Sequence, residues 1–424
     1  MIILGTNSIK DTGYDVANSC RFNDGSSDYM TRAFGASQTS TAAFTVSVWV
    51  KRGALGTRQS IFAAYDGSAA AGDDLEFETD DTLSYNGSGA GANTTSAKFR
   101  DVSAWYHIVV ARNSGATGAA NQVKIYVNGT LQTLGTNAGC NVSQFLRNGL
   151  NSRIGASQNG SAYYVDMYMA EFVAIDGQML DHTSFGEFDE DSPTIWKPKD
   201  VSGLTFGDNG FYLDFENSGA LGADVSGNSN NFTVNNLTAI DQSTDTCTNN
   251  FATMNALGGY GTFSEGNLKF VTSTTDGQWG TSTISLSSGG KWYCEVKMIA
   301  TNDKYQVGLT NNNAQEFTYR VVYRSDGVIY VGGSSTSGYT TYTTNDIIGM
   351  AFDSSNREIT FYKNGSSVGT VTAPALASSV PQDYFFGATA LSSGTLTTEW
   401  NYGNGYFGTT AVSSAQNPDD GIGI

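Results

Sequence analysis

The residues best able to do chemistry in this chain form a short acidic run. Four carboxylates alternate with uncharged residues, at Asp74, Glu76, Glu78 and Asp80. Side chains two apart on a β-strand point to the same face and lie about 6.5–7 Å apart along the backbone. Glycoside hydrolysis uses two carboxyl groups roughly 5–10 Å apart, so the spacing is compatible with a glycosidase.

The surroundings of this run favour a different interpretation. A sugar-cleaving cleft needs flat apolar walls, and no tryptophan lies near the run. We therefore predict that the four acids line a solvated strand face. Glycoside hydrolysis and cation binding are the alternatives.

Other kinds of catalytic site have little support. The chain has only two histidines, His107 and His182, and His107 lies in a strand-like run where a packed residue is expected. The sequence contains no Gly-x-Ser-x-Gly, Walker or His-Glu-x-x-His motif, which are the signatures of common nucleophilic, phosphoryl-transfer and zinc-protease sites. The sequence predicts a protein that is not an enzyme.

Aromatic loop residues are better candidates for a binding site. Sugar recognition needs flat apolar faces with nearby polar groups. Tyr163 and Tyr164 lie in a stretch of Gly, Ser and Asn between two strand-like runs, and the second half of the chain offers a comparable set. The candidate ligand-binding residues are Tyr163, Tyr164, Tyr323, Arg324, Tyr339 and Tyr342.

A β-rich scaffold must position these side chains. The 424 residues include 50 glycines, 12% aromatic and 15% charged residues, a composition typical of strands and turns. The net charge of −18 argues against a nucleic-acid partner, because such binding depends on neutralising phosphates. No segment approaches the ~20 apolar residues that cross a bilayer, so no membrane insertion is expected.

The local pattern agrees with this class. Residues 45–50, 105–110 and 122–127 alternate in short runs bounded by turn residues, as in a sandwich or barrel. Asn-Gly pairs at 128–129 and 364–365 predict type I′ hairpins, one in each half of the chain. Helices should be single turns, of which 181–185 is the best candidate.

The first half resembles the laminin G-like branch of the concanavalin A-like jelly rolls. The resemblance rests on FTVSVWVKR (44–52), WYHIVVAR (105–112), VKIYVNGTLQ (123–132) and the segment RIGASQNGSAYYVDMYMAEFVAIDGQML (153–180). In that family these segments are a core strand, a Trp-led strand, the Asn-Gly hairpin and the last inner strand. The resemblance implies a two-sheet sandwich.

The same resemblance implies one Ca²⁺ on the rim of the first domain, held by side-chain and backbone oxygens. Calcium prefers such hard oxygen ligands, although the sequence has no linear loop motif of the EF-hand type. No other cofactor is expected. The candidate ligands are Asp66, Asp73, Asp74, Asp166 and Asp176.

The second half resembles a SPRY domain, another concanavalin A-like sandwich. The matching segments are GKWYCEVKM (290–298), YQVGLT (305–310), YRSDGVIYVGG (323–333) and NDIIGMAFDSSNREITFYKNGSSVGT (345–370), with 387–402 a weaker match. In SPRY relatives the loops that would hold Tyr323, Arg324, Tyr339 and Tyr342 form a peptide-binding rim. The expected fold class is all-β, with two concanavalin A-like jelly rolls in tandem.

A third resemblance covers roughly residues 185–260. GFYLDFENSG, DVSGNSNNFTVNNL and DTCTNNFATMN are similar to segments of structural and fibre-type proteins of tailed bacteriophages. This implies a virion protein of tail-fibre, head-fibre or decoration type, assembled in the host cytoplasm and then extracellular. The implied partners are other virion proteins, further copies of the chain as a homo-oligomer, and host-surface glycans or proteins.

The expected organisation has five parts. They are an N-terminal docking segment (1–15), a laminin G-like jelly roll (16–216), an Asn/Ser/Thr-rich connector (217–261), a SPRY-like jelly roll (262–410) and a tail (411–424). The expected function is non-enzymatic display of lectin-like domains. A glycan depolymerase, a bacterial surface adhesin and a purely architectural virion subunit are the alternatives.

Overall fold

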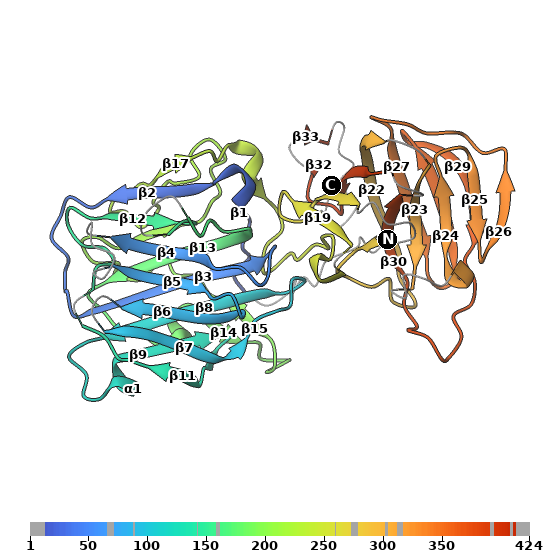
Figure 1. The fold of residues 1–424 in the computed structure, drawn as a ribbon. Helices are drawn as coiled ribbons and strands as arrows, with labels where there is room; N and C mark the ends of the chain where they lie inside the picture. Colours follow the sequence, from blue (N-terminus) through green and yellow to red (C-terminus); the bar gives the residue numbers. More distant parts are fainter. Residues whose placement is uncertain are drawn as a thin grey trace. The chain divides into compact units, whose positions relative to one another are not determined.

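The computed structural model describes residues 13–65, 72–87, 90–141, 143–157, 162–258, 260–272, 279–301, 304–311, 317–390, 394–407 and 410–412. The chain divides into two compact units, which we name the first unit (residues 8–250) and the second unit (containing residues 251–424). Both consist mainly of β-strands (Figure 1). The single α-helix within the described residues is α1 (Ala119–Gln122).

The first unit contains two antiparallel sheets. Sheet 1 has the strand order β10 (Thr130–Leu131), β9 (Val123–Val127), β8 (Trp105–Asn113), β3 (Ala43–Arg52), β13 (Met167–Asp176), β1 (Ser19–Phe22) and β18 (Gln242–Ser243), and β16 (Phe211–Leu213) also pairs with β13. Sheet 2 has the order β11 (Leu134–Asn137), β7 (Gly91–Lys98), β6 (Thr82–Gly87), β5 (Asp73–Phe77), β4 (Gln59–Tyr65), β12 (Asn151–Ile154), β2 (Tyr29–Ala33) and β17 (Thr233–Asn235).

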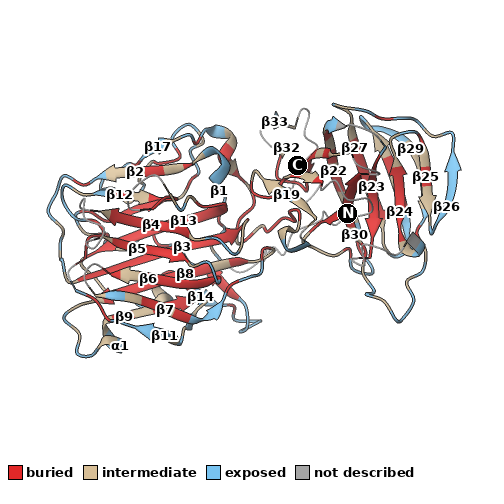
Figure 2. Cartoon of the chain, viewed as in Figure 1, coloured by how far each residue is buried: buried red, intermediate tan, exposed pale blue. Residues whose placement is uncertain are grey.

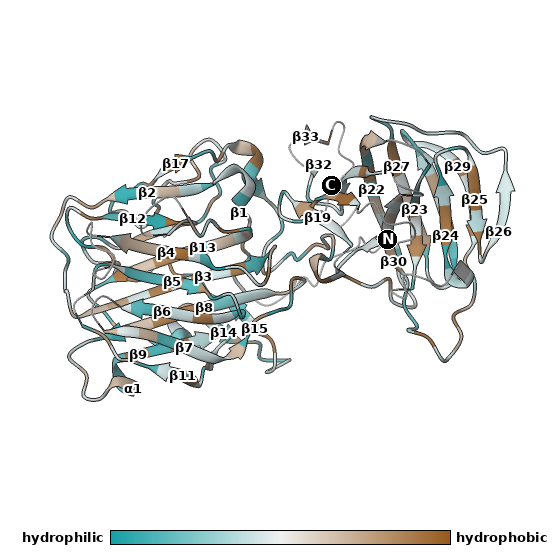
Figure 3. Cartoon of the chain, viewed as in Figure 1, coloured by the Kyte–Doolittle hydropathy of each residue, from teal (hydrophilic) through white to brown (hydrophobic). Residues whose placement is uncertain are grey.

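A hydrophobic core lies between sheets 1 and 2. Val46, Val48 and Val50 of β3 pack in one cluster with Leu75 and Phe77 of β5. The residues between them point to the other face of each strand, because side chains alternate with a period of two. Figure 3 shows this alternation as brown and teal bands along the strands.

The outer face of sheet 1 is also covered. Trp49, Trp105 and Tyr168 on that face pack with Val16 and Trp196, and Trp196 belongs to the small hairpin of β14 (Gly186–Phe188) and β15 (Trp196–Pro198). A neighbouring cluster brings Val109, Tyr126 and Val173 against residues from 185–212. Strands of sheet 1 are therefore buried on both faces (Figure 2).

The predicted connector, residues 217–261, is divided between the units. Up to Asn250 it belongs to the first unit, where it supplies β17 to sheet 2 and β18 to sheet 1. Asp245 anchors it, since Lys51 Nζ donates to its carboxylate at 2.7 Å and Trp105 Nε1 donates at 3.0 Å. Residues 217–250 therefore pack against the sandwich, although they contain few apolar runs long enough to form a strand.

The second unit is a second sandwich. Sheet 3 has the order β19 (Gly261–Ser264), β20 (Lys269–Thr272), β31 (Leu396–Asn401), β22 (Lys291–Thr301), β27 (Ile347–Asp353), β28 (Glu358–Lys363) and β29 (Ser366–Thr372). Sheet 4 has the order β21 (Gly280–Thr281), β30 (Phe385–Ala390), β23 (Tyr305–Thr310), β24 (Val321–Arg324), β25 (Val328–Val331) and β26 (Ser334–Ser337). A two-stranded ribbon pairs β32 (Tyr406–Phe407) with β33 (Thr410–Ala411).

The structure confirms the predicted all-β class and its local turns. Asn128 and Gly129 have φ of 46° and 73°, and Asn364 and Gly365 have 49° and 78°, as a type I′ hairpin requires. A short 3-10 turn at His182–Ser184, capped by Asp181, occupies the predicted single-turn position. Within the described residues no helix is long and apolar enough to span a membrane.

Candidate functional site

Asp74 and Glu76 of the predicted acidic run lie on the outer face of sheet 2, whereas Glu78 and Asp80 lie in the connection between β5 and β6. Cross-strand pairing places Glu76 opposite Ser60 of β4 and Ser84 of β6, and places Asp74 opposite Ala63 and Asn86. The apolar Leu75 and Phe77 face the core, as the alternation predicts. The register thus gathers polar side chains from three neighbouring strands.

The prediction of a solvated acidic face is wrong for two of the four carboxylates. Glu76 is 0% exposed and Asp74 is also buried, whereas Glu78 and Asp80 are accessible. Glu76 is covered because Arg58 Nε donates to its Oε2 at 2.5 Å, and Arg58 Nη2 and Asn86 Nδ2 both donate to its Oε1. Burial of both acids removes them from direct contact with a bulky ligand.

The electrostatics of the cluster follow from this burial. Ser60 Oγ donates to Asp74 Oδ1 at 2.5 Å. Desolvation, and then the charge of Glu76, raises the pKa of Asp74 well above its usual value. Hydrogen bonds to Glu76 raise the pKa of Arg58, in spite of partial burial. Arg58 is therefore a permanent cation that is already paired.

Four accessible side chains surround this buried pair. Tyr163 is 44% exposed, and the Arg58 guanidinium lies 4.6 Å from the centre of its ring. The side chains of Arg58 and Glu78 are 32% and 30% exposed, and their charged atoms are 3.9 Å apart. Asn86 completes the group. We name Arg58, Glu78, Asn86 and Tyr163 the Tyr163 patch.

The backbone fixes the position of Tyr163. Its φ is 56°, in the left-handed region, which is uncommon for a bulky residue and costs about 1 kcal/mol or more. The Tyr163 carbonyl accepts a hydrogen bond from Ser60 N at 2.9 Å. This bond ties the loop to β4, and the aromatic ring is held beside Arg58.

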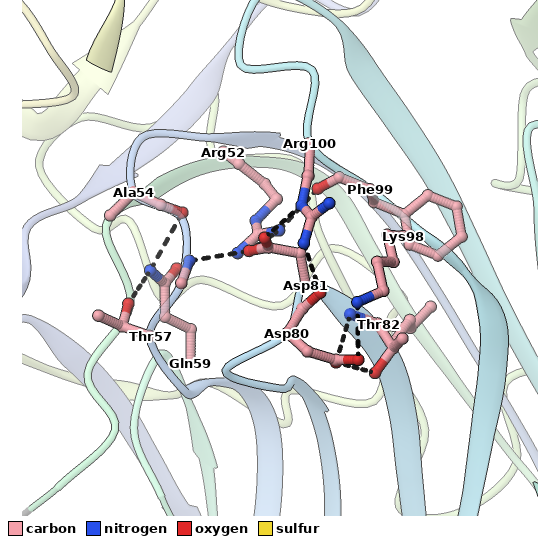
Figure 4. A network of polar contacts seen from close by, with 12 residues as sticks. Arg52, Ala54, Thr57, Gln59, Asp80, Asp81, Thr82, Lys98, Phe99 and Arg100 are labelled. Carbon is pink, nitrogen blue, oxygen red and sulfur yellow. Dashed lines mark hydrogen bonds and ion pairs between the residues drawn. The ribbon is translucent and has the colours of Figure 1, made fainter. Parts of the chain in front are cut away.

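A network of hydrogen bonds and ion pairs connects the loop before β4 with the β5–β6 turn (Figure 4). Asp81 accepts hydrogen bonds from Arg52 Nη1 at 3.2 Å, from Arg100 Nε at 2.8 Å and from Gly56 N at 2.8 Å. Burial opposes ionisation of Asp81, but these donors outweigh it and lower its pKa. The network joins the loop that leads into Arg58 to the β5–β6 turn that follows Glu78.

The structure does not bring the candidate calcium ligands together. Asp73 accepts hydrogen bonds from Ser143 Oγ and Gln144 N, and Asp176 accepts from Thr39 N and Asn209 N. Asp73 and Asp176 therefore fix loops in place through buried hydrogen bonds. Asp74 lies on the opposite face of β5, the Asp166 carbonyl accepts from Gly53 N at 2.8 Å, and Asp66 lies outside the described residues.

The candidate calcium carboxylates do not form a cluster within the described residues. Within the described part of the chain, no three His, Cys, Asp or Glu side chains are grouped as metal ligands. Asp176 Oδ1 and Asn209 Oδ1 are buried without hydrogen-bond partners.

The predicted rim residues of the second unit divide into core and surface. Placing Tyr323 and Tyr342 on the rim was wrong: both are fully buried and their rings pack 4.7 Å apart. Tyr342 Oη donates to the Tyr323 carbonyl at 2.8 Å, so the pair anchors the 340–342 loop. Arg324 is paired with Asp326, and Tyr339 is half-buried against Gly369.

Tyr164 lies beside the patch residue Tyr163. It is half-buried, and its ring lies 6.2 Å from that of Tyr29. Of the six predicted ligand-binding residues, Tyr163 is the one that joins the acidic cluster. Arg58 and Asn86 were not predicted, because only the strand register reveals that they meet Glu76.

One Ser–His pair occurs on the covered outer face of sheet 1, and its geometry opposes nucleophilic catalysis. Trp196 Nε1 donates to His107 Nδ1 at 2.8 Å, so the ring proton is on Nε2 and is donated to Ser47 Oγ at 2.8 Å. Burial also lowers the pKa of His107 to about 3. His107 is a packed residue, as predicted, and does not act as a base toward Ser47.

Comparison with protein families agrees with the two sandwiches. Residues 24–180 match the laminin G-like family model described as the concanavalin A-like lectin/glucanases superfamily, and residues 291–397 match the SPRY domain model. The chain thus consists of two concanavalin A-like β-sandwich domains. The first is a laminin G-like domain, and the second, in tandem, is a SPRY domain.

Solved structures with similar folds are distant. The SPRY domain of human HERC1 is 18% identical with a TM-score of 0.28, covering 31% of this chain and 87% of its own. A candidate carbohydrate-binding protein of Bacteroides ovatus is 14% identical with a TM-score of 0.37, covering 52% of this chain and 59% of its own. A heptameric SAP-like pentraxin of Limulus polyphemus is 15% identical with a TM-score of 0.26, covering 37% and 80%. Comparison with curated protein sequences gave no match.

Proposed function

We propose that the chain is a non-enzymatic, lectin-like binding protein whose first unit binds glycans at the Tyr163 patch. The observation that carries this proposal is an exposed tyrosine, held by strained backbone, whose ring lies against Arg58, together with the accessible carboxylate of Glu78, 3.9 Å from the same guanidinium. A flat aromatic face packs against the C–H side of a sugar ring. Glu78 and Asn86 supply the polar groups that orient hydroxyls.

A binding assay on the full-length chain tests the proposal. We expect glycan-array or calorimetric binding by the wild type and at least a roughly 10-fold loss in Tyr163→Ala, since the stacking ring is removed. Tyr330→Ala, in the second unit, is the control and should bind as the wild type does. Equal binding by Tyr163→Ala and the wild type would remove the patch from the proposal, and absence of all binding would favour an architectural subunit.

Hydrolysis of the bound glycan is the competing enzymatic function. Burial of Asp74 and Glu76, together with the pairing of Glu76 with Arg58, argues against a carboxylate pair that could flank a glycosidic bond. We expect no fall in polysaccharide viscosity on incubation with the protein. A fall that Glu78→Gln abolishes would establish a depolymerase instead.

We further propose that the binding units are displayed on a bacteriophage virion as a fibre or decoration protein. Support comes from the resemblance of residues 185–260 to phage fibre-type segments. Repeated copies would turn weak single-site affinity into avidity. Mass spectrometry of purified particles tests this directly: the polypeptide should be present, and its absence would favour a cellular adhesin.

A further inference from the structure

An accessible arginine such as Arg58 could bind an acidic sugar, but the contacts of Arg58 within the protein argue against this role. Its Nε and Nη2 both donate to the buried Glu76 carboxylate, and its guanidinium lies over the Tyr163 ring. A bidentate carboxylate occupies the planar edge that an arginine would use for a ligand carboxylate or sulfate. Arg58 is therefore committed within the protein.

The remaining charge at the patch is acidic. Glu78 Oε2 lies 3.9 Å from Arg58 Nε, beyond hydrogen-bond distance, and its side chain is 30% exposed. Arg153, another cation of sheet 2, is on β12, with β4 between it and β5. Arg58 lies against the Tyr163 ring but is paired with Glu76, so the accessible charge that remains in the patch is that of Glu78, 3.9 Å from Arg58 Nε.

We propose that the Tyr163 patch selects glycans bearing a protonated amine, such as unacetylated hexosamines, and rejects uronates and sulfated sugars. This inference rests on the proposed glycan-binding function. The sugar ring would stack on Tyr163, and its ammonium group would pair with Glu78. A carboxylate or sulfate in that place would meet Glu78, and the Nε/Nη2 edge of Arg58, which could have bound it, is already occupied by Glu76.

The test compares three oligosaccharides of equal length with the full chain by calorimetry, at a pH where the amine is protonated. They are oligomers of glucosamine, of N-acetylglucosamine and of galacturonic acid. We expect the glucosamine oligomer to bind about 5-fold more tightly than its N-acetylated counterpart, the size of one exposed charge pair, and the galacturonate to bind weakest. Raising the salt from about 0.05 to about 0.5 M should reduce the preference, since exposed pairs are screened.

Two variants locate the selectivity. Glu78→Gln should reduce glucosamine binding to the level of the N-acetylated oligomer, whereas Glu190→Gln, an exposed acid in the β14–β15 turn, should not. Equal effects of both variants would trace the preference to the net charge of −18 and overturn the assignment to the patch.

The failures of the two proposals are distinguishable. Tighter binding of the N-acetylated or the acidic oligomer, lost in Tyr163→Ala, would overturn amine selectivity and leave the glycan site standing. Binding of none of the three oligomers, together with silence on a broad glycan array, would overturn the glycan site itself.

Discussion

Glu171 is a buried carboxylate whose backbone also lies in the left-handed region. It lies in β13 where the pairing with β3 is irregular, and its φ is 49°. Tyr212 Oη donates to Glu171 Oε2 at 2.6 Å, and Tyr14 Oη lies 2.8 Å from Tyr212 Oη. Burial raises the pKa of Glu171 to about 7, although the two tyrosines oppose this shift.

The raised pKa predicts a dependence of stability on pH. The folded chain keeps the Glu171 proton up to about pH 7, whereas the unfolded chain loses it near pH 4.3. Between these values the folded state binds more protons, so the free energy of unfolding falls as pH rises, by at most about 4 kcal/mol. We expect Glu171→Gln to remove this fall, measured by urea unfolding at several pH values relative to wild type.

The control for this prediction is Glu358→Gln, an exposed acid of β28 in the second unit. It should leave the pH profile of unfolding unchanged. If Glu171→Gln and the wild type have parallel profiles from pH 4 to pH 8, Glu171 is ionised in the fold and the prediction fails.

Residue patterns alone predicted part of the site. Alternation correctly placed Asp74 and Glu76 on the face opposite Leu75 and Phe77, and loop composition singled out Tyr163. Burial was not predictable, because Arg58 reaches Glu76 only through the β4–β5 register, which a single sequence does not encode locally. The same limit explains why Tyr323 and Tyr342 were assigned to the rim, since a tyrosine beside a loop has the same local signature whether its ring points inward or outward.

At the scale of elements, the two Asn-Gly hairpins differ in what packs against them. A Cβ on Gly129 would lie 2.3 Å from a ring carbon of Trp196, whereas a Cβ on Gly365 would meet nothing within 4 Å. The two turns have nearly the same φ, 73° and 78°. The first hairpin therefore has a packing role in addition to its turn, because it receives the Trp196 ring on the covered face of sheet 1.

This difference predicts unequal costs for the same substitution. Both Gly129→Ala and Gly365→Ala place a side chain at positive φ, which costs about 1 kcal/mol. Gly129→Ala should cost about 1–3 kcal/mol more, because the Trp196 ring must move. Hydrogen exchange of the hairpin amides in the full chain measures both, each relative to wild type. Equal losses of protection in the two hairpins would show that Trp196 adapts freely.

The strands, like the two hairpins, could be predicted because their residue patterns are local in the sequence. The runs at 45–50 and 105–110 carry β-branched and aromatic residues at period two, and they form β3 and β8. The layer that covers sheet 1 was not predictable. Its residues, such as Trp196 and those near Asp245, lie in segments without a strand pattern and fold through side-chain contacts distant in sequence.

The buried pair of Lys51 and Asp245 shows how that covering layer is fixed. Both side chains are almost completely buried, and Lys51 Nζ also donates to Asn250 Oδ1 at 2.8 Å. Removing one partner leaves an uncompensated buried charge, which costs about 3–5 kcal/mol. We expect that loss of unfolding free energy in Asp245→Ala, measured by urea unfolding.

A double variant separates charge from packing in this prediction. Lys51→Met with Asp245→Leu replaces the pair by apolar groups and should be less destabilising than Asp245→Ala alone, because no unpaired charge remains buried. A double variant at least as unstable as the single one would show that the ion pair itself stabilises the layer.

At the scale of the whole molecule, strand pairing and burial locate the C-terminal boundary of the first unit. Residues 217–250 add β17 and β18, and Leu221, Phe232 and Leu237 from this stretch are buried in the sandwich core. A composition rich in Asn, Ser and Thr concealed this role, because a few well-spaced apolar residues are enough to close a sheet edge. The compact unit therefore ends near Asn250, and we expect that limit to govern autonomous folding.

Two fragments test this limit. A fragment of residues 8–250 should unfold cooperatively by circular dichroism, since it retains the core cluster and the Asp245 partner of Lys51. A fragment of residues 8–216 exposes Phe211 and β2 and leaves Lys51 buried without Asp245, so it should melt at least about 10 °C lower or fail to fold, given that 1 kcal/mol shifts the midpoint of a domain of this size by about 2–4 °C. Equal melting temperatures for the two fragments would mean that residues 217–250 pack on a sandwich that is already complete, and the ion pair would then stabilise the covering layer alone.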